Sequence, residues 1–544
     1  MQHEPRVTTG SGLSKTVGRL LAASAVAMLI VSIGFRCRSL DNIPGVNGDE
    51  AWYGLRAMEI LQGHAWNVVT PTGNVPNPLF LCPLVLLHLA LRPAIWVLRS
   101  VSLASGLAAL AVNFWLCRRV FDRLTAVIST LCLAVLPVNI AYSRFAWDAS
   151  QSLLVTLPVL YLALAALRFP AQRGRLLPAA IAAQVWAFLV HPTNIFVAPV
   201  IAAAGLASIS WGNVRNTGLR GLLPRRVPYL AICITGLLVV LAGLWLHTPA
   251  SPRATSRLTS LNKLLDFRGM SQCAALYPRL IAGDTVYRYI AGSDSWLRWP
   301  ARHESNRVGV DVLLVWGALL GAAWRLRPWR RGEDSRVDGA LLAAWAMTLA
   351  GFVLVANVPG IRPGYERMAI CLVAPTVLVL ARGTRRFVAD APRRSAAVLF
   401  AASLLGWLLL ADFQAHYFRF IERTGGESHA TFRTAQVDPK SAALAAVLRE
   451  RGPGETWIVS SQWWICCPLG YLAAAEPGVH VLSTLDAVND LPPRALAEGR
   501  VWYVEFCGTR ELAEVESRLS QQSISREDFA DFSGRPVVRL VHVR

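Results

Sequence analysis

The chain has 544 residues, of which 54% are hydrophobic and only 16% are charged, and its mean hydropathy is +0.41. Because a soluble domain carries roughly 25% charged residues, this composition excludes an ordinary soluble enzyme and a disordered chain. The formal net charge of +20 would suggest nucleic-acid binding in a soluble protein. Here the basic residues fall mostly in short loops between apolar blocks, so we expect a multi-pass membrane protein with no nucleic-acid partner.

Eleven apolar blocks are long enough to cross a bilayer as helices. They lie near residues 17–35, 96–117, 124–141, 150–167, 177–190, 194–210, 229–246, 309–324, 340–356, 367–381 and 396–412. The first resembles a signal peptide, but it lacks a clean small-residue cleavage site and is followed by Arg36 and Arg38, which favours an uncleaved first helix. The segment 78–91 is short and contains Pro83, so it predicts an interfacial helix on the outer leaflet.

The charges of the loops predict the topology. Five loops together hold 20 basic residues against 5 acidic ones: 118–123, 168–175, 211–226, 325–338 and 382–394. They alternate with basic-poor loops at 142–149, 191–193 and 357–366. An eleven-helix path with residues 1–16 in the cytoplasm places every basic loop inside. We therefore expect a protein of the cytoplasmic (inner) membrane whose C-terminus lies outside the cytoplasm.

The chain divides into two predicted domains. Residues 17–412 form an all-helical transmembrane domain with long external loops at 36–95 and 247–308, and residues 413–544 form a small external α/β domain. In the latter, SAALAAVLRER is typical of a helix, whereas WIVSS, VHVLST, VWYVEF and RPVVRLVHV are typical of short strands. Cys466, Cys467 and Cys507 of this domain lack zinc-finger spacing, and a disulfide among them is left open.

Two adjacent acids, Asp49 and Glu50, lie in the first external loop just beyond the predicted outer membrane face. They begin the stretch DEAWYGLRAMEIL, whose apolar side chains would lie against lipid. A structural interpretation makes Asp49 the N-cap or first residue of this short helix. A catalytic interpretation makes it a carboxylate that takes a proton from the hydroxyl or amine of an acceptor.

A further acid, Asp148, lies in the short external loop YSRFAWDAS. Arg144 precedes it by four residues, so the two side chains would share one face of a helical turn and could form an ion pair. The alternative is a functional role, because ionisable residues at the edge of the hydrocarbon phase are functional candidates by default.

Two other external segments carry candidate phosphate ligands. Tyr365 and Arg367 lie in NVPGIRPGYERMAI, and arginine suits phosphate because its planar fork donates paired hydrogen bonds. Anchoring of the helix end in the membrane interface is the alternative. His191 in FLVHPTNIF is either a satisfied interfacial histidine or a ligand, and no H-E-x-x-H spacing supports a metal there.

The sequence lacks a Walker lysine loop, a Gly-rich dinucleotide motif and a G-x-S-x-G elbow. These absences argue against an ATP-driven pump and against a cytoplasmic nucleotide-sugar enzyme. A donor substrate must then reach the outer face in activated form, carried on a lipid.

These motifs together resemble the GT-C glycosyltransferases, specifically the bacterial branch related to dolichyl-phosphate-mannose protein mannosyltransferases and lipid A aminoarabinose transferases. The resemblance covers about residues 15–420 and is most specific in DEAWYGLRAMEILQG. Two further motifs support it: YSRFAWD, and the arginine and tyrosine residues of NVPGIRPGYERMAI at the start of a late helix. It implies transfer of a sugar from a polyprenyl-phosphate donor to an envelope acceptor outside the cytoplasmic membrane. It also implies Asp49 as the general base, with Glu50 and Asp148 as companion acids.

The chain departs from the aminoarabinose transferases, which tend to have a lysine before a Pro-Pro-Leu run, because it reads NVPNPLF at that point. Arg144 or Arg367 would then hold the donor phosphate. The further candidates for this role are Arg56, Tyr365 and His191.

The sugar, the acceptor (lipid, glycan or protein) and any divalent metal ion stay open at this point, and no cofactor is certain. Two other classes of function remain. A transporter or lipid flippase would need broken helices and polar groups near the bilayer midplane, whereas these acids cluster at the outer interface. A non-catalytic envelope scaffold would use the C-terminal domain to bind a partner.

Overall fold

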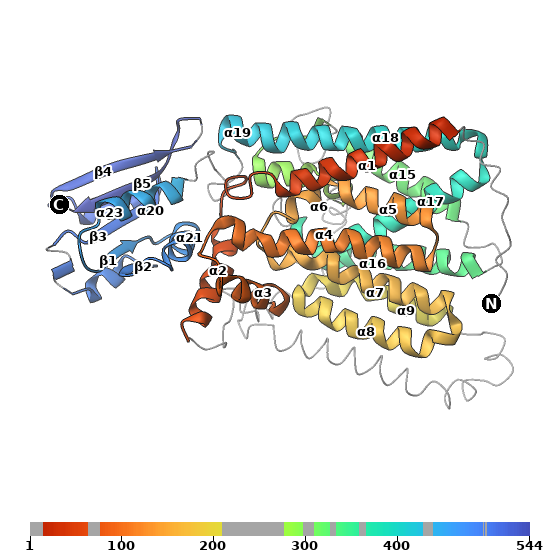
Figure 1. Ribbon diagram of the computed structural model, residues 1–544, viewed down its shortest axis with the longest axis horizontal. Helices are drawn as coiled ribbons and strands as arrows, with labels where there is room; N and C mark the ends of the chain where they lie inside the picture. The colour runs from red at the N-terminus through yellow and green to blue at the C-terminus, as the bar shows by residue number, and fades with distance from the viewer. Residues whose placement is uncertain are drawn as a thin grey trace.

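The computed structural model describes residues 15–63, 77–208, 277–296, 309–326, 333–357, 366–427, 439–492, 494–495, 498–531 and 533–543. Within these ranges the protein is an elongated bundle of helices with a smaller α/β domain at one end (Figure 1). The bundle contains α1 (Lys15–Cys37), α4 (Ile95–Val120), α5 (Arg123–Val135), α6 (Pro137–Tyr142), α7 (Ser152–Arg168), α8 (Arg173–Val190), α9 (Pro199–Ala207), α15 (Val310–Leu326), α16 (Glu333–Asn357), α17 (Val373–Asp390) and α18 (Pro392–Phe413). Short helical turns connect several of them: η1 (Asp148–Gln151), η2 (Pro170–Gln172), η3 (Pro192–Val197), α14 (Asp284–Val286), η6 (Tyr287–Ala291) and η8 (Glu366–Leu372).

Five helical stretches in the described part of the chain are long and apolar enough to cross a membrane. They are Lys15–Cys37, Ile95–Val120, Asp148–Arg168, Asp334–Val353 and Arg393–Thr424. Ten of the eleven predicted blocks coincide with helices of the bundle, and the block near 229–246 lies outside the described residues. The protein is therefore a helical, multi-pass membrane protein, and the total of eleven spans stays a prediction.

The predicted block 124–141 is divided in the structure. Pro137 has no N–H to continue the helix and its ring restricts the preceding residue, so Leu136 adopts an extended conformation (φ −63°, ψ 123°). The chain therefore breaks between α5 and α6 at the end of the bundle that faces the α/β domain (Figure 1). The described residues of the predicted basic loops lie at the opposite end of the bundle, as a common cytoplasmic side requires.

The C-terminal domain is a three-layer α/β/α structure. Its elements are α20 (Pro439–Glu450), β1 (Thr456–Val459), α21 (Trp463–Ala473), β2 (Val479–Leu482), η11 (Asp486–Asp490), β3 (Val501–Phe506), α23 (Arg510–Arg518), β4 (Ile524–Ala530) and β5 (Pro536–Val543). The strand order is β2-β1-β3-β5-β4; β1 is parallel to β2 and β3, and β5 is antiparallel to β3 and β4. The helices α20 and α21 pack on one face of the sheet, and α23 packs on the other.

The four strands predicted from the sequence are present as β1, β2, β3 and β5, but β4 was missed. Its sequence, ISREDFA, is mostly polar because it forms an exposed edge of the sheet. The helix α21 was also missed.

The predicted domain boundary at residue 413 falls inside a continuous helical stretch, since η9 (Gln414–Arg419) and α19 (Phe420–Thr424) prolong α18.

The α/β domain docks on the bundle through α21, which packs against α2 (Gly48–Leu61) of the first external loop (Figure 1). Close approach depends on glycine: a Cβ atom at Gly54 would lie 2.5 Å from the ring of Tyr471. The Tyr471 hydroxyl in turn donates to the carbonyl oxygen of Ala94 (3.0 Å), just before α4. Cys466 and Cys467 are buried in this contact, and both are free thiols, as is Cys507.

The helix predicted at 78–91 is α3 (Pro78–His88), which contains Pro83 and packs beside α2 and α4. Its interfacial position in a membrane stays a prediction. His88 at its end contacts the Tyr471 hydroxyl (3.3 Å), so α3 also contributes to the docking of the α/β domain.

We expect Gly54→Leu to separate α21 from α2, because the added side chain overlaps the Tyr471 ring. Cys466 and Cys467 would then react with a membrane-impermeant maleimide, read by peptide mass spectrometry. Gly18→Leu is the matched control, because nothing lies within 4 Å of a Cβ atom at Gly18. Equal labelling of both thiols in the two variants would contradict the observed docking.

Candidate functional site

The first external loop turns into α2 through a capping box. The Asn47 side chain accepts a hydrogen bond from the Glu50 N–H (3.0 Å), and the Glu50 carboxylate accepts one from the Asn47 N–H (3.4 Å). The expectation that Asp49 is the N-cap or first residue is therefore wrong: Asn47 is the cap and Gly48 begins the helix. Asp49 has an exposed side chain that capping does not explain.

Glu50 forms a buried, two-pronged ion pair with Arg99 of α4. The Arg99 Nε and Nη2 atoms donate to its two carboxylate oxygens at 2.9 and 2.8 Å, and both side chains are 0% exposed. The Ala146 N–H, from the second external loop, donates to the same carboxylate (2.9 Å). The other Arg99 donors reach the carbonyl oxygens of Leu40, Pro44 and Gly45. Every oxygen of Glu50 is thus engaged, so this acid fixes the loop.

Arg144 is buried as well, although the sequence suggested a phosphate ligand or an ion pair with Asp148. Its guanidinium donates instead to backbone carbonyl oxygens of the segment that follows α1: Phe35, Arg36, Ser39 and Ile43. It also lies over the ring of Phe418, 4.9 Å from its centroid. The Arg144 side chain is 0% exposed. Its hydrogen bonds to the carbonyl oxygens of Ser39 and Ile43 hold the start of the first loop in place.

Asp49 and Asp148 both influence one buried phenol, that of Tyr53. Burial, and then the negative charges of Asp148 and Asp49, raise the pKa of Tyr53 well above its usual value. The charges of both carboxylates therefore act on the Tyr53 phenol. The Tyr53 ring is held by edge-on contacts with Trp52 (5.2 Å between centroids) and Phe80 (4.9 Å).

The turn that carries Asp148 is anchored by Gln151. Its amide group accepts from the Asn77 side chain (2.6 Å) and donates to the Leu79 carbonyl oxygen (2.9 Å), so the far end of the first external loop holds η1. Asp148 itself is half-buried and accepts from the Ala149 N–H (2.7 Å). No pattern in the sequence indicates Gln151 or Asn77, since their pairing joins residues 74 positions apart.

Two of the remaining predicted residues, His191 and Arg367, belong to short helical segments at the same end of the bundle. The short helices η3 and η8 contact each other, and η8 also contacts η1. His191 caps η3, where its Nδ1 atom lies 2.6 Å from the Thr193 hydroxyl. Arg367 belongs to η8, but its side chain, like the whole of Tyr365, lies outside the described residues.

Arg56 lies on α2, two helical turns after Asp49 and on the same side. It pairs with Glu59 on the same helix and lies 5.7 Å from the centroid of the Trp52 ring. Its side chain is 31% exposed, so a ligand can reach it. Within the described part of the chain, no three His, Cys, Asp or Glu residues are grouped as metal ligands, and the question of a divalent ion stays open.

The α/β domain reaches Asp49 directly, which the sequence did not indicate. The indole N–H of Trp463, the first residue of α21, donates to an Asp49 carboxylate oxygen (3.3 Å). The buried Lys440 ammonium of α20 donates to the Val46 carbonyl oxygen (2.5 Å), three residues before Asp49. The site thus consists of Asp49, Tyr53 and Asp148, with Trp463 over one side.

Comparison with solved structures identifies the fold. Two crystal structures of ArnT from Cupriavidus metallidurans, one apo and one bound to undecaprenyl phosphate, match 97% of this chain and 98% of theirs, with a TM-score of 0.52 and identities of 15% and 14%. An oligosaccharyltransferase from Archaeoglobus fulgidus, tethered with an acceptor peptide, matches 90% of this chain and 69% of its own at 14% identity and a TM-score of 0.48. No family model and no curated protein matches. The chain has the GT-C fold, as the resemblance implied.

We expect Glu50→Gln to lower the free energy of unfolding by about 3–5 kcal/mol, because it leaves the Arg99 guanidinium buried without a counter-charge. Glu59→Gln is the matched control: its pair with Arg56 is partly exposed, and its loss should cost at most about 1 kcal/mol. Thermal melts of both purified variants in detergent make the comparison. Indistinguishable melting temperatures would show that the pair does not hold the loop.

Proposed function

We propose that this protein is a membrane glycosyltransferase that moves a sugar from a polyprenyl-phosphate donor to an acceptor on the outer side of the cytoplasmic membrane. The observation that carries this proposal is the difference between two adjacent acids. Glu50 is held in a buried ion pair by Arg99, whereas Asp49 presents an exposed carboxylate whose charge, like that of Asp148, acts on the Tyr53 phenol. The GT-C fold, shared with an ArnT structure bound to undecaprenyl phosphate, supports the lipid-linked donor.

Asp49 is assigned the role of general base. Its carboxylate removes the proton of an acceptor hydroxyl or amine as that atom bonds to the anomeric carbon of the donor sugar. The bond from the anomeric carbon to the phosphate oxygen breaks, and polyprenyl phosphate leaves with the bonding pair. A single displacement of this kind inverts the configuration at the anomeric carbon. Asp148, whose charge also acts on Tyr53, is the second acid available to bind the sugar or the acceptor.

The departing phosphate needs cationic groups close to it. The Nη1 and Nη2 atoms of Arg144 donate to backbone carbonyl oxygens and the side chain is fully buried, so we assign this residue to positioning rather than to phosphate binding. Arg56 and Arg367 are the arginines that remain for the donor, with Tyr365 and His191 as neutral or weakly basic partners. Arg56 is favoured by its exposure on the face of α2 that carries Asp49.

The external α/β domain is assigned to the acceptor side. It covers part of the first loop, and Trp463 places an indole N–H on the proposed base. An acceptor that approaches Asp49 from outside the membrane must therefore pass α21. The identity of that acceptor (lipid, glycan or protein) and of the sugar is for the assay to determine.

Asp49→Asn should lower turnover by about 10²–10⁴-fold, because it removes the proton acceptor and keeps the shape of the side chain. Stability should hardly change, since Asp49 is exposed and is not the cap of α2. The assay follows sugar transfer from a synthetic polyprenyl-phosphate sugar in liposomes, with candidate envelope glycolipids and glycans as acceptors.

Asp148→Asn in the same assay tests whether the second acid also acts. A well-folded Asp49→Asn protein with near-full turnover would remove Asp49 as the base and leave Asp148 as the next candidate. Movement of the intact lipid-linked sugar across the liposome membrane, without transfer, would instead identify a flippase.

Trp463→Phe should lower turnover about tenfold, because the ring stays while the N–H that orients Asp49 is lost; a hydrogen bond to a charged group is worth roughly this factor. Trp464→Phe is the matched control, since Trp464 is the next residue and is 40% exposed. The melting temperatures of the two variants should agree. An equal loss of turnover in both would show that the indole N–H has no specific role.

A further inference from the structure

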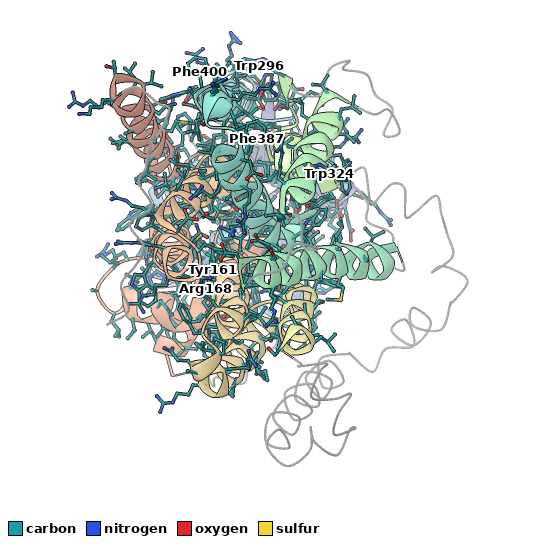
Figure 2. All side chains as sticks on the ribbon, turned by 90° about the vertical axis from the view of Figure 1, so that its right-hand side faces the viewer. Tyr161, Arg168, Trp296, Trp324, Phe387 and Phe400 are labelled. Carbon is teal, nitrogen blue, oxygen red and sulfur yellow. The ribbon has the colours of Figure 1, made fainter. Side chains whose placement is uncertain are left out.

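A surface cavity of about 320 Å³ lies at the end of the bundle opposite the α/β domain. Its lining residues come from the C-terminal ends of α15 and α17 and from the start of α18: Arg325, Phe387, Asp390, Ala391, Arg393 and Arg394. Figure 2 faces this end of the molecule and labels Phe387 within the bundle, with Trp324 beside it on α15. The volume is at the lower end of the range of about 300–1,000 Å³ that small-molecule sites occupy.

The cavity has an excess of positive charge. Three of its lining residues are arginines and one is an acid. The Arg325 guanidinium lies over the Phe387 ring, 4.7 Å from its centroid, which fixes one charge in the wall of the cavity. Arg393 and Arg394 lie in the first turn of α18 and are exposed.

The arginines of the neighbouring helix α17 are neutralised in a different way. Arg382 forms a two-pronged pair with the buried Asp338 (2.9 and 3.1 Å), and Arg386 joins the same carboxylate (2.8 Å). Within the described part of the chain, Arg325, Arg393 and Arg394 have no such carboxylate partner. Arginines that lack such a carboxylate partner among the described residues therefore line the hollow in the surface, and an anion is the ligand that this arrangement fits.

The surroundings of the cavity indicate which anion. The helix α17 contacts both α15 and α18, so these two helices flank it. Their outward faces carry large exposed apolar side chains: Leu313, Leu314, Leu320 and Trp324 on α15, and Phe400, Leu404, Leu405 and Leu408 on α18. Apolar rows of this kind lie against acyl chains in a bilayer, and the charge pattern assigns this end to the cytoplasmic leaflet.

We propose that this cavity binds the phosphate headgroup of an anionic phospholipid, with its acyl chains along α15 and α18. Planar guanidinium groups donate paired hydrogen bonds to phosphate oxygens, and basic pockets between transmembrane helices on the cytoplasmic side recognise such headgroups. The site lies at the other end of the bundle from Asp49, so it is independent of the proposed transferase chemistry.

The test uses the full-length protein, delipidated in detergent and titrated with phosphatidylglycerol or phosphatidylcholine, with retained lipid counted by native mass spectrometry. We expect phosphatidylglycerol to bind about tenfold more tightly or better. Arg393→Ala/Arg394→Ala should reduce its affinity by about tenfold or more. The matched control, Arg118→Ala/Arg119→Ala, removes the same charge at the same end of the bundle, at the last turn of α4, and should change the affinity by less than about threefold.

Inorganic phosphate separates the two sources of the ligand. If millimolar phosphate displaces phosphatidylglycerol from the wild-type protein, the site takes free phosphate and the lipid assignment is overturned. Equal affinity for the two lipids, or equal losses in the two double variants, would also overturn it. Should the α18 double variant fail to fold, Arg325→Met keeps the side chain against Phe387 without its charge, and retention of full affinity in that variant contradicts the proposal.

Discussion

The ion pair between Arg99 and Glu50 is the constraint on which the rest of the candidate site depends. Removing two charges from water is costly, and a buried pair is sustained only when its remaining hydrogen-bonding atoms are also satisfied. Here the partners that satisfy it come from the segment after α1, from the cap of α2 and from the Ala146 N–H. One interaction thus joins the first loop with α2, the helix α4 and the loop that carries Ala146, which are distant from one another in the sequence. Asp49 is adjacent to Glu50 and Asp148 is two residues from Ala146, so the same junction positions both acids.

The external domain reaches the same junction from the other side. Lys440 donates to the carbonyl oxygen of Val46, Trp463 donates to Asp49, and the Tyr471 hydroxyl is bonded at Ala94, ahead of the helix that carries Arg99. The contact is tight because glycine occupies the positions on α2 where a side chain would overlap α21. A shift of the domain would therefore change the hydrogen bond to Asp49. The domain can therefore influence the proposed reaction at Asp49 as well as the approach of the acceptor.

The sequence predicted well what depends on local pattern and poorly what depends on distant partners. Hydrophobic blocks and loop charges predicted the helices of the bundle, and alternation predicted four of the five strands, whereas the polar edge strand β4 has no such signal. The sequence indicated Asp49 and Glu50 as candidate acids of the first loop, but it did not indicate that their roles differ. The reason is that Arg99, the partner of Glu50, lies 49 residues away in the sequence. Arg144 illustrates the same limit: a loop arginine suggests a ligand, and only the fold shows that backbone carbonyl oxygens surround it.

The arginines of this protein are neutralised by different means at the two ends of the bundle. At the end that bears the acids, Arg144 is surrounded by carbonyl oxygens and Arg99 has both carbonyl oxygens and Glu50, so neither charge is available to a ligand. At the other end, Arg382 and Arg386 are matched by Asp338. Arg99, Arg144, Arg382 and Arg386 are committed to structure in this way, so the residue type of an arginine does not by itself indicate a ligand. Exposure to solvent is the further criterion behind the proposed ligand-binding arginines, and it explains why residue type and position in a loop were insufficient to choose among them.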